Sequence, residues 1–244
     1  MSAKTKSTAE HAQALIGTGL YSVREASRLS GVSSPKIRRW LFGYQSRRQG
    51  NVVQHSPVWQ GQLSEEGLLG VGFLDLLEIR FVDAFQSYGV SLQSIRSASD
   101  FARKMFNSSH PFTLKKFQTD GQTIFAELLE QGAAEDDAAL IDLVKRQLTF
   151  KQVIQPSLRG IVYGETGEAQ AWHPNNSRSI ILDPDRSFGK PIDERSGVPT
   201  EVIYSAYQTG EPVQMISRLY QIEPRAVKAA VEFETSLRER EVLH

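Results

Sequence analysis

Two short helix-forming segments follow one another near the N-terminus, and the turn between them is only three residues long. Ser22 precedes the first segment and Glu25 lies three residues further on, which is the spacing of a capping box at a helix start. Gly31-Val32-Ser33 then interrupts the helical pattern, and Pro35 occupies the first turn of the second segment. Two helices joined so tightly must pack across each other, so this pattern predicts a helix-turn-helix from about residue 21 to residue 44.

The second of these helices has an apolar face and a basic face. Ile37, Trp40 and Leu41 recur at helical spacing and are expected to be buried. The start of a helix offers unpaired backbone N–H groups that suit phosphates, and arginine side chains can reach guanine edges in the major groove. We therefore expect DNA contacts from the outward residues of this helix and from the segment after it, namely Ser33, Ser34, Lys36, Arg38, Arg39, Tyr44, Arg47 and Arg48.

The segment after the second helix favours a two-stranded wing. Residues 45–62 are rich in Gln, Arg, Gly, Ser and Val, and Gly50-Asn51 is a suitable tip for a pair of antiparallel strands. Beyond the wing, Phe73–Phe85 forms an amphipathic helix that ends near Gly89, and a further helix runs from Leu92 to about Phe106. We expect the Phe73–Phe85 helix to belong to the core or to a dimer interface.

Charge is distributed unevenly along a chain whose formal net charge is +0. The first 60 residues hold nine basic and two acidic side chains, whereas residues 61–150 hold eight basic and thirteen acidic ones. A basic head on a mildly acidic body is expected of a protein whose N-terminal domain meets phosphates. A solvated basic face without a partner is the alternative.

The middle of the chain favours short strands. Phe112–Phe117 and Thr123–Leu129 flank Asp120-Gly121, a dipeptide typical of hairpin turns. Further strands are expected at Leu140–Val144, Ile161–Tyr163 and Ala169–Trp172, with a turn at residues 164–167. Together they predict a small antiparallel sheet.

Three helical stretches are expected in the last quarter of the chain. Thr200 caps Glu201–Tyr207, and the second and third stretches are Val213–Tyr220 and Arg225 to about Arg240. A trihelical bundle of this size is a second helix-turn-helix candidate. Arg225 and Lys228 mark its third stretch as a second DNA-binding or dimerisation helix.

The predicted fold class is therefore α+β, in four parts. Residues 1–20 are expected to be a flexible arm, 21–108 a winged helix-turn-helix domain, 109–176 a central β-rich segment, and 177–244 a C-terminal trihelical domain.

Several function classes are excluded by composition. The chain has no cysteine, so it has no disulfide, thiolate metal site or cysteine nucleophile. It has no run of about 18 apolar residues, and the five histidines are scattered without metal-ligand spacing. We expect no catalytic residues, metal or cofactor, no membrane contact, and a cytoplasmic location.

The N-terminal motifs also resemble a known family. Tyr21-Ser22-Val23-Arg24-Glu25-Ala26, then Gly31-Val32-Ser33, then Ile37-Arg38-Arg39-Trp40 are similar to the winged helix-turn-helix of MerR-type regulators. The segment Tyr88-Gly89-Val90-Ser91-Leu92-Gln93-Ser94-Ile95-Arg96 is similar to the segment that follows the wing in that family. The resemblance covers roughly residues 20–105 and implies a DNA-binding regulator.

The tail resembles a small helical domain found in VapB-type antitoxins, through Ile181-Leu182-Asp183-Pro184, Phe188-Gly189-Lys190-Pro191-Ile192 and Val198-Pro199-Thr200. In place of that family's Arg-Gly-Thr-Arg element the chain has Asp193-Glu194-Arg195-Ser196-Gly197. Both halves together are similar to a larger VapB-like group. The resemblance implies an autoregulating antitoxin, a homodimer that binds double-stranded DNA at its own operator and pairs with a PIN-type ribonuclease toxin.

Two other functions stay open at this point. The chain is alternatively a MerR-like, ligand-sensing regulator without a toxin partner, in which the central sheet and the tail bind a small molecule. In a third interpretation the middle and the tail only bind another protein, and DNA binding is secondary.

Overall fold

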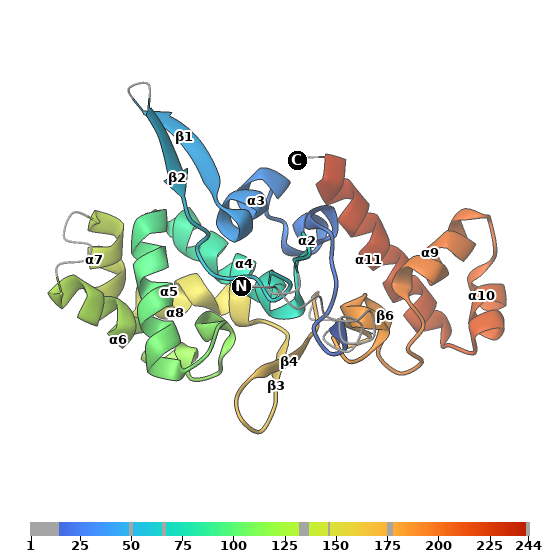
Figure 1. The fold of residues 1–244 in the computed structure, drawn as a ribbon. Coiled ribbons are helices and arrows are strands. Elements are labelled where there is room, and N and C mark those ends of the chain that lie inside the picture. The colour runs from blue at the N-terminus through green and yellow to red at the C-terminus, as the bar shows by residue number, and fades with distance from the viewer. Residues whose placement is uncertain are drawn as a thin grey trace, which may run out of the picture.

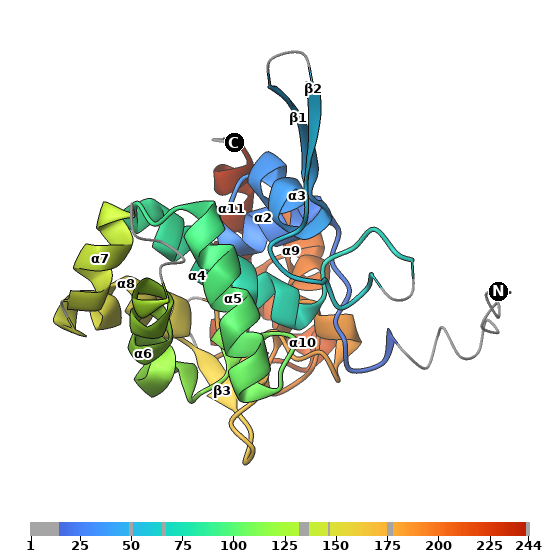
Figure 2. The ribbon, with the colours of Figure 1, turned by 60° about the vertical axis from the view of Figure 1, so that its left-hand side comes forward.

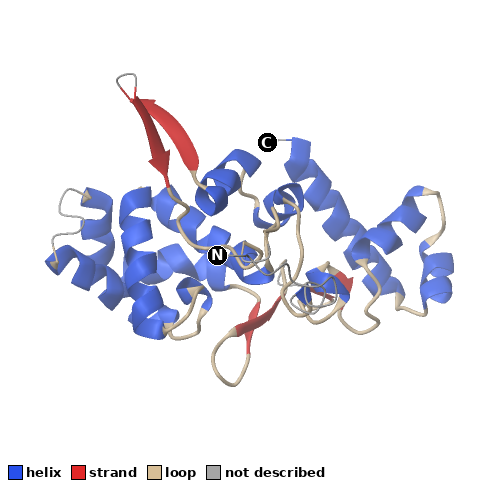
Figure 3. Cartoon of the chain, viewed as in Figure 1, coloured by secondary structure: helices blue, strands red, loops and turns tan. Residues whose placement is uncertain are grey.

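The computed structural model of the chain describes residues 15–48, 51–64, 67–131, 137–145, 147–174 and 178–242. Helices dominate these ranges, and their strands form two-stranded antiparallel pairs (Figure 3). The molecule is elongated, with helix α6 (Phe117–Glu130) near one end and α10 (Val213–Tyr220) at the other (Figure 1). None of the helices in the described ranges is long and apolar enough to cross a membrane.

The predicted helix-turn-helix is present as α2 (Val23–Ser30) and α3 (Ser34–Phe42). The backbone N–H of Glu25 donates to the hydroxyl of Ser22 at 3.2 Å, and the Ser22 N–H donates to the Glu25 carboxylate at 2.8 Å. Gly31 ends α2 with φ = 76°, a left-handed conformation that favours glycine. The local caps that predicted α2 therefore set its bounds.

The described part of the predicted arm is held by the rest of the chain. The backbone N–H of Leu20 donates to the carbonyl of Phe188 at 3.0 Å, and the N–H of Phe73 donates to the carbonyl of Thr18 at 2.8 Å. Residues 15–20 are therefore not a loose arm, which corrects the prediction for this stretch, and residues 1–14 lie outside the described residues.

The predicted wing is a pair of antiparallel strands, β1 (Tyr44–Arg48) and β2 (Asn51–His55). Tyr44 lies opposite His55 in the register. Gly43 precedes β1 with φ = 72°, and a Cβ atom there would lie 2.4 Å from the carbonyl oxygen of His55. Glycine is thus required where α3 passes into the wing. The predicted tip residue Gly50 lies outside the described residues, and the strands end at His55 rather than at residue 62.

Two helices follow the wing at the predicted places, α4 (Phe73–Tyr88) and α5 (Leu92–Phe106). Gly89 ends α4 with φ = 106°, and the hydroxyl of Ser91 accepts the Ser94 N–H at the start of α5. α4 is the centre of the core, because many of its side chains are fully buried: Leu76, Leu77, Ile79, Phe81, Val82 and Phe85.

The hairpin predicted around Asp120-Gly121 is wrong. Both residues lie inside helix α6, whose buried side chains recur with the 3.6-residue period of a helix. A Cβ atom on Gly121 would lie 2.7 Å from Cζ of Phe150. This glycine therefore permits close packing between α6 and α8 (Gln147–Leu158), and it makes no turn.

The strand predicted at Leu140–Val144 is also wrong, because these residues belong to helix α7 (Ala138–Lys145). The predicted pair β3 (Ile161–Tyr163) and β4 (Ala169–Trp172) is present. With the short helix η1 (Pro111–Thr113) and helices α6 to α8, most of the described central segment is helical rather than β-rich.

The last part of the chain holds the three predicted helical stretches, as α9 (Thr200–Gln208), α10 and α11 (Pro224–Val242). Before them lie the strand pair β5 (Ile180–Ile181) and β6 (Ile192–Asp193), with η2 (Ser187–Gly189) between its strands. The predicted cap at Thr200 is wrong by one residue, because Pro199 is the N-cap. The hydroxyl of Thr200 instead donates to the carboxylate of Glu234 in α11 at 2.5 Å.

A cluster of phenylalanine rings fills the core between α4, η1, α6 and α8. The Phe85 ring centroid lies 5.0 Å from that of Phe125 and 5.8 Å from that of Phe112. Edge-to-face contacts of this kind add to the free energy gained by burying the rings. The cluster fixes the position of α4, on which the wing and the helix-turn-helix rest.

Replacing Phe85 with alanine should lower the free energy of unfolding by about 3–5 kcal/mol, because a fully buried ring is lost from this cluster. Urea denaturation of the purified chain measures the change. Phe188→Ala is the matched control, since that ring is 58% exposed and its loss should change stability by less than about 0.5 kcal/mol. Equal losses in the two variants would contradict the assignment of the core.

Candidate nucleic-acid interface

Helix α3 presents a buried face and a charged face. Ile37, Trp40 and Leu41 are buried against the rest of the N-terminal unit, as predicted. The opposite face carries the three exposed cations of the helix, Lys36, Arg38 and Arg39. α3 therefore offers a basic surface on a helix whose orientation is set by its apolar anchors.

The N-terminal end of α3 suits an anion. Ser33 is the N-cap residue, and its hydroxyl makes no capping hydrogen bond. Ser33 and Ser34 are both half-buried. The first turn of a helix has N–H groups without partners inside the helix, and these groups and the helix dipole favour a phosphate at this end.

Arg39 is braced against the wing by a stack of three side chains. Its guanidinium lies 4.2 Å from the ring centroid of Tyr44 in β1. The Tyr44 ring stacks on that of His55 in β2, with centroids 4.2 Å apart and an angle of 9°. The hydroxyl of Ser46 forms a hydrogen bond with Nε2 of His55 at 2.9 Å. Tyr44 thus supports Arg39 in the unbound chain, and the stack joins α3 to the wing.

Lys36 is engaged by the neighbouring helix. Its ammonium group lies 3.1 Å from the carboxylate of Asp83 in α4. The pair is partly exposed, with half of the Lys36 side chain open to solvent, so it is screened by water. Of the three cations on α3, Lys36 is therefore the one already partly neutralised.

The wing rises beyond α3 on the same side of the molecule in both views (Figures 1 and 2). Arg47 in β1 is exposed, and Val52 and Val53 in β2 are 60% and 37% exposed. Arg48 ends β1, but its side chain lies outside the described residues. The described wing thus presents a cation and two apolar side chains to solvent.

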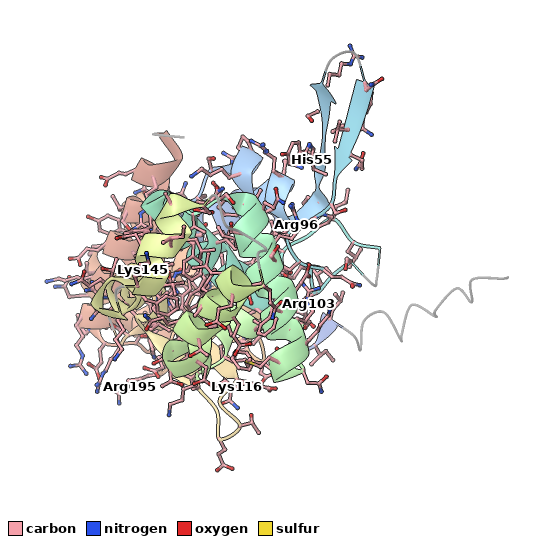
Figure 4. All side chains as sticks on the ribbon, turned by 90° about the vertical axis from the view of Figure 1, so that its left-hand side faces the viewer. His55, Arg96, Arg103, Lys116, Lys145 and Arg195 are labelled. Atoms are coloured by element: carbon pink, nitrogen blue, oxygen red, sulfur yellow. The ribbon has the colours of Figure 1, made fainter. Side chains whose placement is uncertain are left out.

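The base of the wing is tied to the core. The guanidinium of Arg96 in α5 donates to the carbonyls of Ser56 and Pro57, at 2.9 and 3.3 Å, and Figure 4 shows Arg96 below His55. The backbone N–H of Val58 donates to the carbonyl of Trp40 at 2.7 Å. These bonds hold the chain that returns from the wing against α3 and α5.

The same returning chain is fastened by the buried carboxylate of Asp75 in α4. Asp75 is fully buried and accepts hydrogen bonds from Trp59 Nε1 and His110 Nε2, each at 2.8 Å. It also accepts the backbone N–H groups of Gln62 and Gly72, at 3.0 and 2.9 Å. A buried carboxylate needs such donors to offset its lost hydration.

A second buried carboxyl lies one turn further along α4. Glu78 accepts the backbone N–H of Phe112 at 3.0 Å, while its Oε2 has no hydrogen-bond partner among the described residues. Burial raises the pKa of Glu78 well above its ordinary value, and the nearby charge of Asp75 raises it further. The neutral acid is thus favoured at this position.

The predicted second DNA-binding or dimerisation helix starts far from this surface. Arg225 and Lys228 are exposed on the first turns of α11, at the α9–α10 end of the molecule, whereas the last turn of α11 lies beside α3 (Figure 1). Arg225 pairs with Glu223, which also pairs with Arg195, around a cavity of about 570 Å³. The two cations do not join the basic face of α3.

The C-terminal part packs on the first helix of the helix-turn-helix. The hydroxyl of Tyr21 donates to the carbonyl of Gly189 at 2.6 Å in a buried position, and burial raises the pKa of Tyr21. Arg28 in α2 lies 3.7 Å from the carboxylate of Glu234 in α11. α2 is therefore held between α4 and α11.

Sequence reasoning missed the supporting residues of this surface. His55 lies opposite Tyr44 in the observed register, whereas a two-residue tip at Gly50-Asn51 would have placed Pro57 there. Asp75, Arg96 and His110 also have partners 13 to 40 residues away along the chain, and these long-range contacts gave no local signal. The predicted contact residues themselves stay predictions.

Family comparisons agree with this geometry at the N-terminus. Residues 19–99 match a family model described as "Putative DNA-binding HTH domain", a range that contains α2, α3, the wing and α4. The chain therefore carries a helix-turn-helix domain of a DNA-binding kind, as predicted. Residues 180–233 match a model described as "Protein of unknown function (DUF433)".

Two matches from Mycobacterium tuberculosis extend over most of the chain. One, from strain H37Rv, is named "Putative antitoxin VapB45" and is 26% identical over 223 residues, which cover 87% of this chain and 92% of the relative. The crystal structure of Rv2018 matches with a TM-score of 0.64 and 22% identity, over 88% of this chain and 99% of that one. The second match shows that the fold recurs in a solved structure.

The raised pKa of Glu78 makes stability depend on pH. The folded chain binds this proton more tightly than the unfolded chain does, so its contribution is complete below the ordinary pKa of 4.5 and is lost as pH rises through the raised value. Glu78→Gln removes the titration. From pH 4.5 upward, wild type should therefore lose stability relative to this variant, by up to about 1.4 kcal/mol per pH unit.

Urea denaturation at a series of pH values measures this difference. Glu201→Gln, which changes an exposed carboxylate of α9 in the same way, is the control and should follow wild type. Parallel stability curves for wild type and Glu78→Gln would show that the buried carboxyl does not titrate as described.

Proposed function

We propose that this chain is a sequence-specific transcriptional regulator and the antitoxin of a type II toxin–antitoxin pair. The observation that supports DNA binding most is the exposed basic face of α3. Its Arg39 lies over the ring of Tyr44 in the wing, and Arg96 holds the base of the wing by hydrogen bonds. The antitoxin part is supported by a relative of that name, whose similarity extends over nearly the whole of both chains.

In the proposed complex, α3 enters the major groove as the second helix of a MerR-like winged helix-turn-helix. Arg38 and Arg39 read base edges, where a bidentate arginine–guanine pair contributes about 1–3 kcal/mol of discrimination. Ser33, Ser34 and the first-turn N–H groups hold a phosphate, and Lys36 exchanges Asp83 for the DNA backbone. Arg47 and Arg48 contact DNA from the wing.

The proposed regulator works as a homodimer in the cytoplasm and represses its own operon. A two-fold dimer matches paired half-sites on DNA, which is the common arrangement for helix-turn-helix proteins. Its proposed partner is a PIN-type ribonuclease toxin, encoded beside it, that the chain neutralises by direct binding. DNA reading and toxin binding then occupy different parts of one chain.

Arg38→Ala combined with Arg39→Ala should weaken binding to the chain's own promoter DNA by about tenfold or more, because two contacts to bases or phosphates are lost. Fluorescence anisotropy with labelled promoter fragments measures the affinity. The matched control is Arg195→Ala combined with Arg218→Ala, which removes the same charge from exposed positions of the C-terminal part and should keep the affinity. Unchanged binding by the Arg38 and Arg39 variant would refute α3 as the recognition helix.

Co-expression with the small open reading frame beside its gene tests the antitoxin function. Wild type should relieve the growth arrest that the neighbouring gene product causes. The Arg38 and Arg39 double variant should relieve it equally well, because neutralisation does not use the DNA surface. If wild type leaves the arrest unchanged, the antitoxin assignment fails and a regulator without a toxin partner is the better description.

A further inference from the structure

A small cavity lies beside the chain that returns from the wing. It has a volume of about 280 Å³, and it is bounded by the chain returning from the wing, by α5 and by the loop between α5 and η1. The side chains that line it include Gln60, Gln62, Arg103, Ser109 and His110. This volume approaches the lower end of the range for small-molecule sites in proteins.

Hydrogen-bond donors converge on this cavity. The Oε1 atom of Gln62 already accepts the Leu74 N–H at 2.7 Å, so the amide NH₂ is the donor that Gln62 has left. Ser109 is exposed, and its hydroxyl is already engaged in a hydrogen bond with His110 Nδ1 at 2.9 Å. Among the described residues that line the cavity there is no carboxylate.

Arg103 gives the cavity a positive charge. Figure 4 shows Arg103 on α5 below Arg96. The Arg103 guanidinium lies 3.2 Å from the carboxylate of Asp100, which is 55% exposed, and a partly exposed pair of this kind costs little to exchange for another anion. Arg103 can therefore turn to a ligand at small cost.

The two buried carboxyls of α4, Asp75 and Glu78, do not line the cavity. Asp75 is surrounded by four donors, one of them His110 Nε2, which donates because a carboxylate only accepts. Burial favours the neutral form of Glu78. Among the described residues that line the cavity, Arg103 carries the one permanent charge, and the cavity rests on a buried network that holds His110 in place.

We propose that this cavity binds a small oxyanion, a molecule with a phosphate or carboxylate group, through the guanidinium of Arg103 and the amide donor of Gln62. The cavity is formed in part by residues 60–62, just after the segment that Arg96 ties down. A bound anion therefore bridges α5 and the chain returning from the wing. That coupling makes the anion an effector of DNA binding, a consequence that rests on the proposed function.

Isothermal titration calorimetry with inorganic phosphate and with succinate, against chloride at matched ionic strength, tests the site. We expect at least one of the two probes to bind wild type. Arg103→Gln should weaken that binding by about tenfold or more, because a charge-assisted hydrogen bond is lost. Lys104→Gln removes an exposed charge from the next position of α5 and should stay within about twofold of wild type.

Ser109→Ala is a second variant, since its exposed hydroxyl can be removed without a cavity in the core. It should stay within about twofold of wild type, because this hydroxyl is hydrogen-bonded to His110 Nδ1 and is not a contact of the ligand. Thermal unfolding of each variant verifies that it is folded. Absence of binding by wild type to both probes, or equal affinities in Arg103→Gln and Lys104→Gln, overturns the proposal.

Hydrogen exchange and DNA binding separate this site from its neighbours. The anion should slow amide exchange of residues 56–62 in wild type and leave it unchanged in Arg103→Gln. If Arg103→Gln weakens DNA binding in chloride alone as strongly as the Arg38 and Arg39 variant does, Arg103 is a DNA backbone contact and the anion site is refuted. If the chain binds phosphate but no promoter DNA, the anion site is supported and the proposed function is refuted.

Discussion

The buried carboxylate of Asp75 is the interaction on which the arrangement of the N-terminal half depends. One side chain in α4 gathers donors from the wing return at Trp59 and Gln62, from the start of its own helix at Gly72, and from His110 near η1. A charge in that position is tolerable only while all of these segments are in place. The chain that returns from the wing is therefore fixed to the core, although the strands of the wing project from the body of the molecule.

The parts of the fold that the sequence predicts well are those with local causes. The capping box at Ser22 and Glu25, the left-handed glycines at 31 and 89, and the apolar period of α4 each need only a few consecutive residues. The same is true of α3, because Ile37, Trp40 and Leu41 identify its buried face and leave the cations outside. The exposed basic surface could thus be predicted before its surroundings were known.

The strand prediction for the central segment was wrong because tertiary packing outweighed a local turn signal. Asp120-Gly121 is a strong turn signal in isolation, yet Gly121 lies under the ring of Phe150, where a larger residue would collide with it. The hydrogen-bond network around Asp75 was not predicted from the sequence, for a different reason. Asp75 and His110 are separated by 35 residues, and no rule about neighbouring residues connects them. Lys36 and Asp83, which pair between α3 and α4, escape sequence analysis for the same reason.

Helix α11 covers the first helix of the DNA-binding unit, since Leu237 and Leu29 belong to one core and Glu234 lies beside Arg28. A ribosome releases residues in order, so α2 emerges about two hundred residues before its cover, and its apolar side faces water or a chaperone in the meantime. The N-terminal unit thus reaches its final packing only after α11 has been synthesised. A message cut short upstream of α11 would yield a regulator with an uncovered apolar helix, prone to aggregation and to degradation.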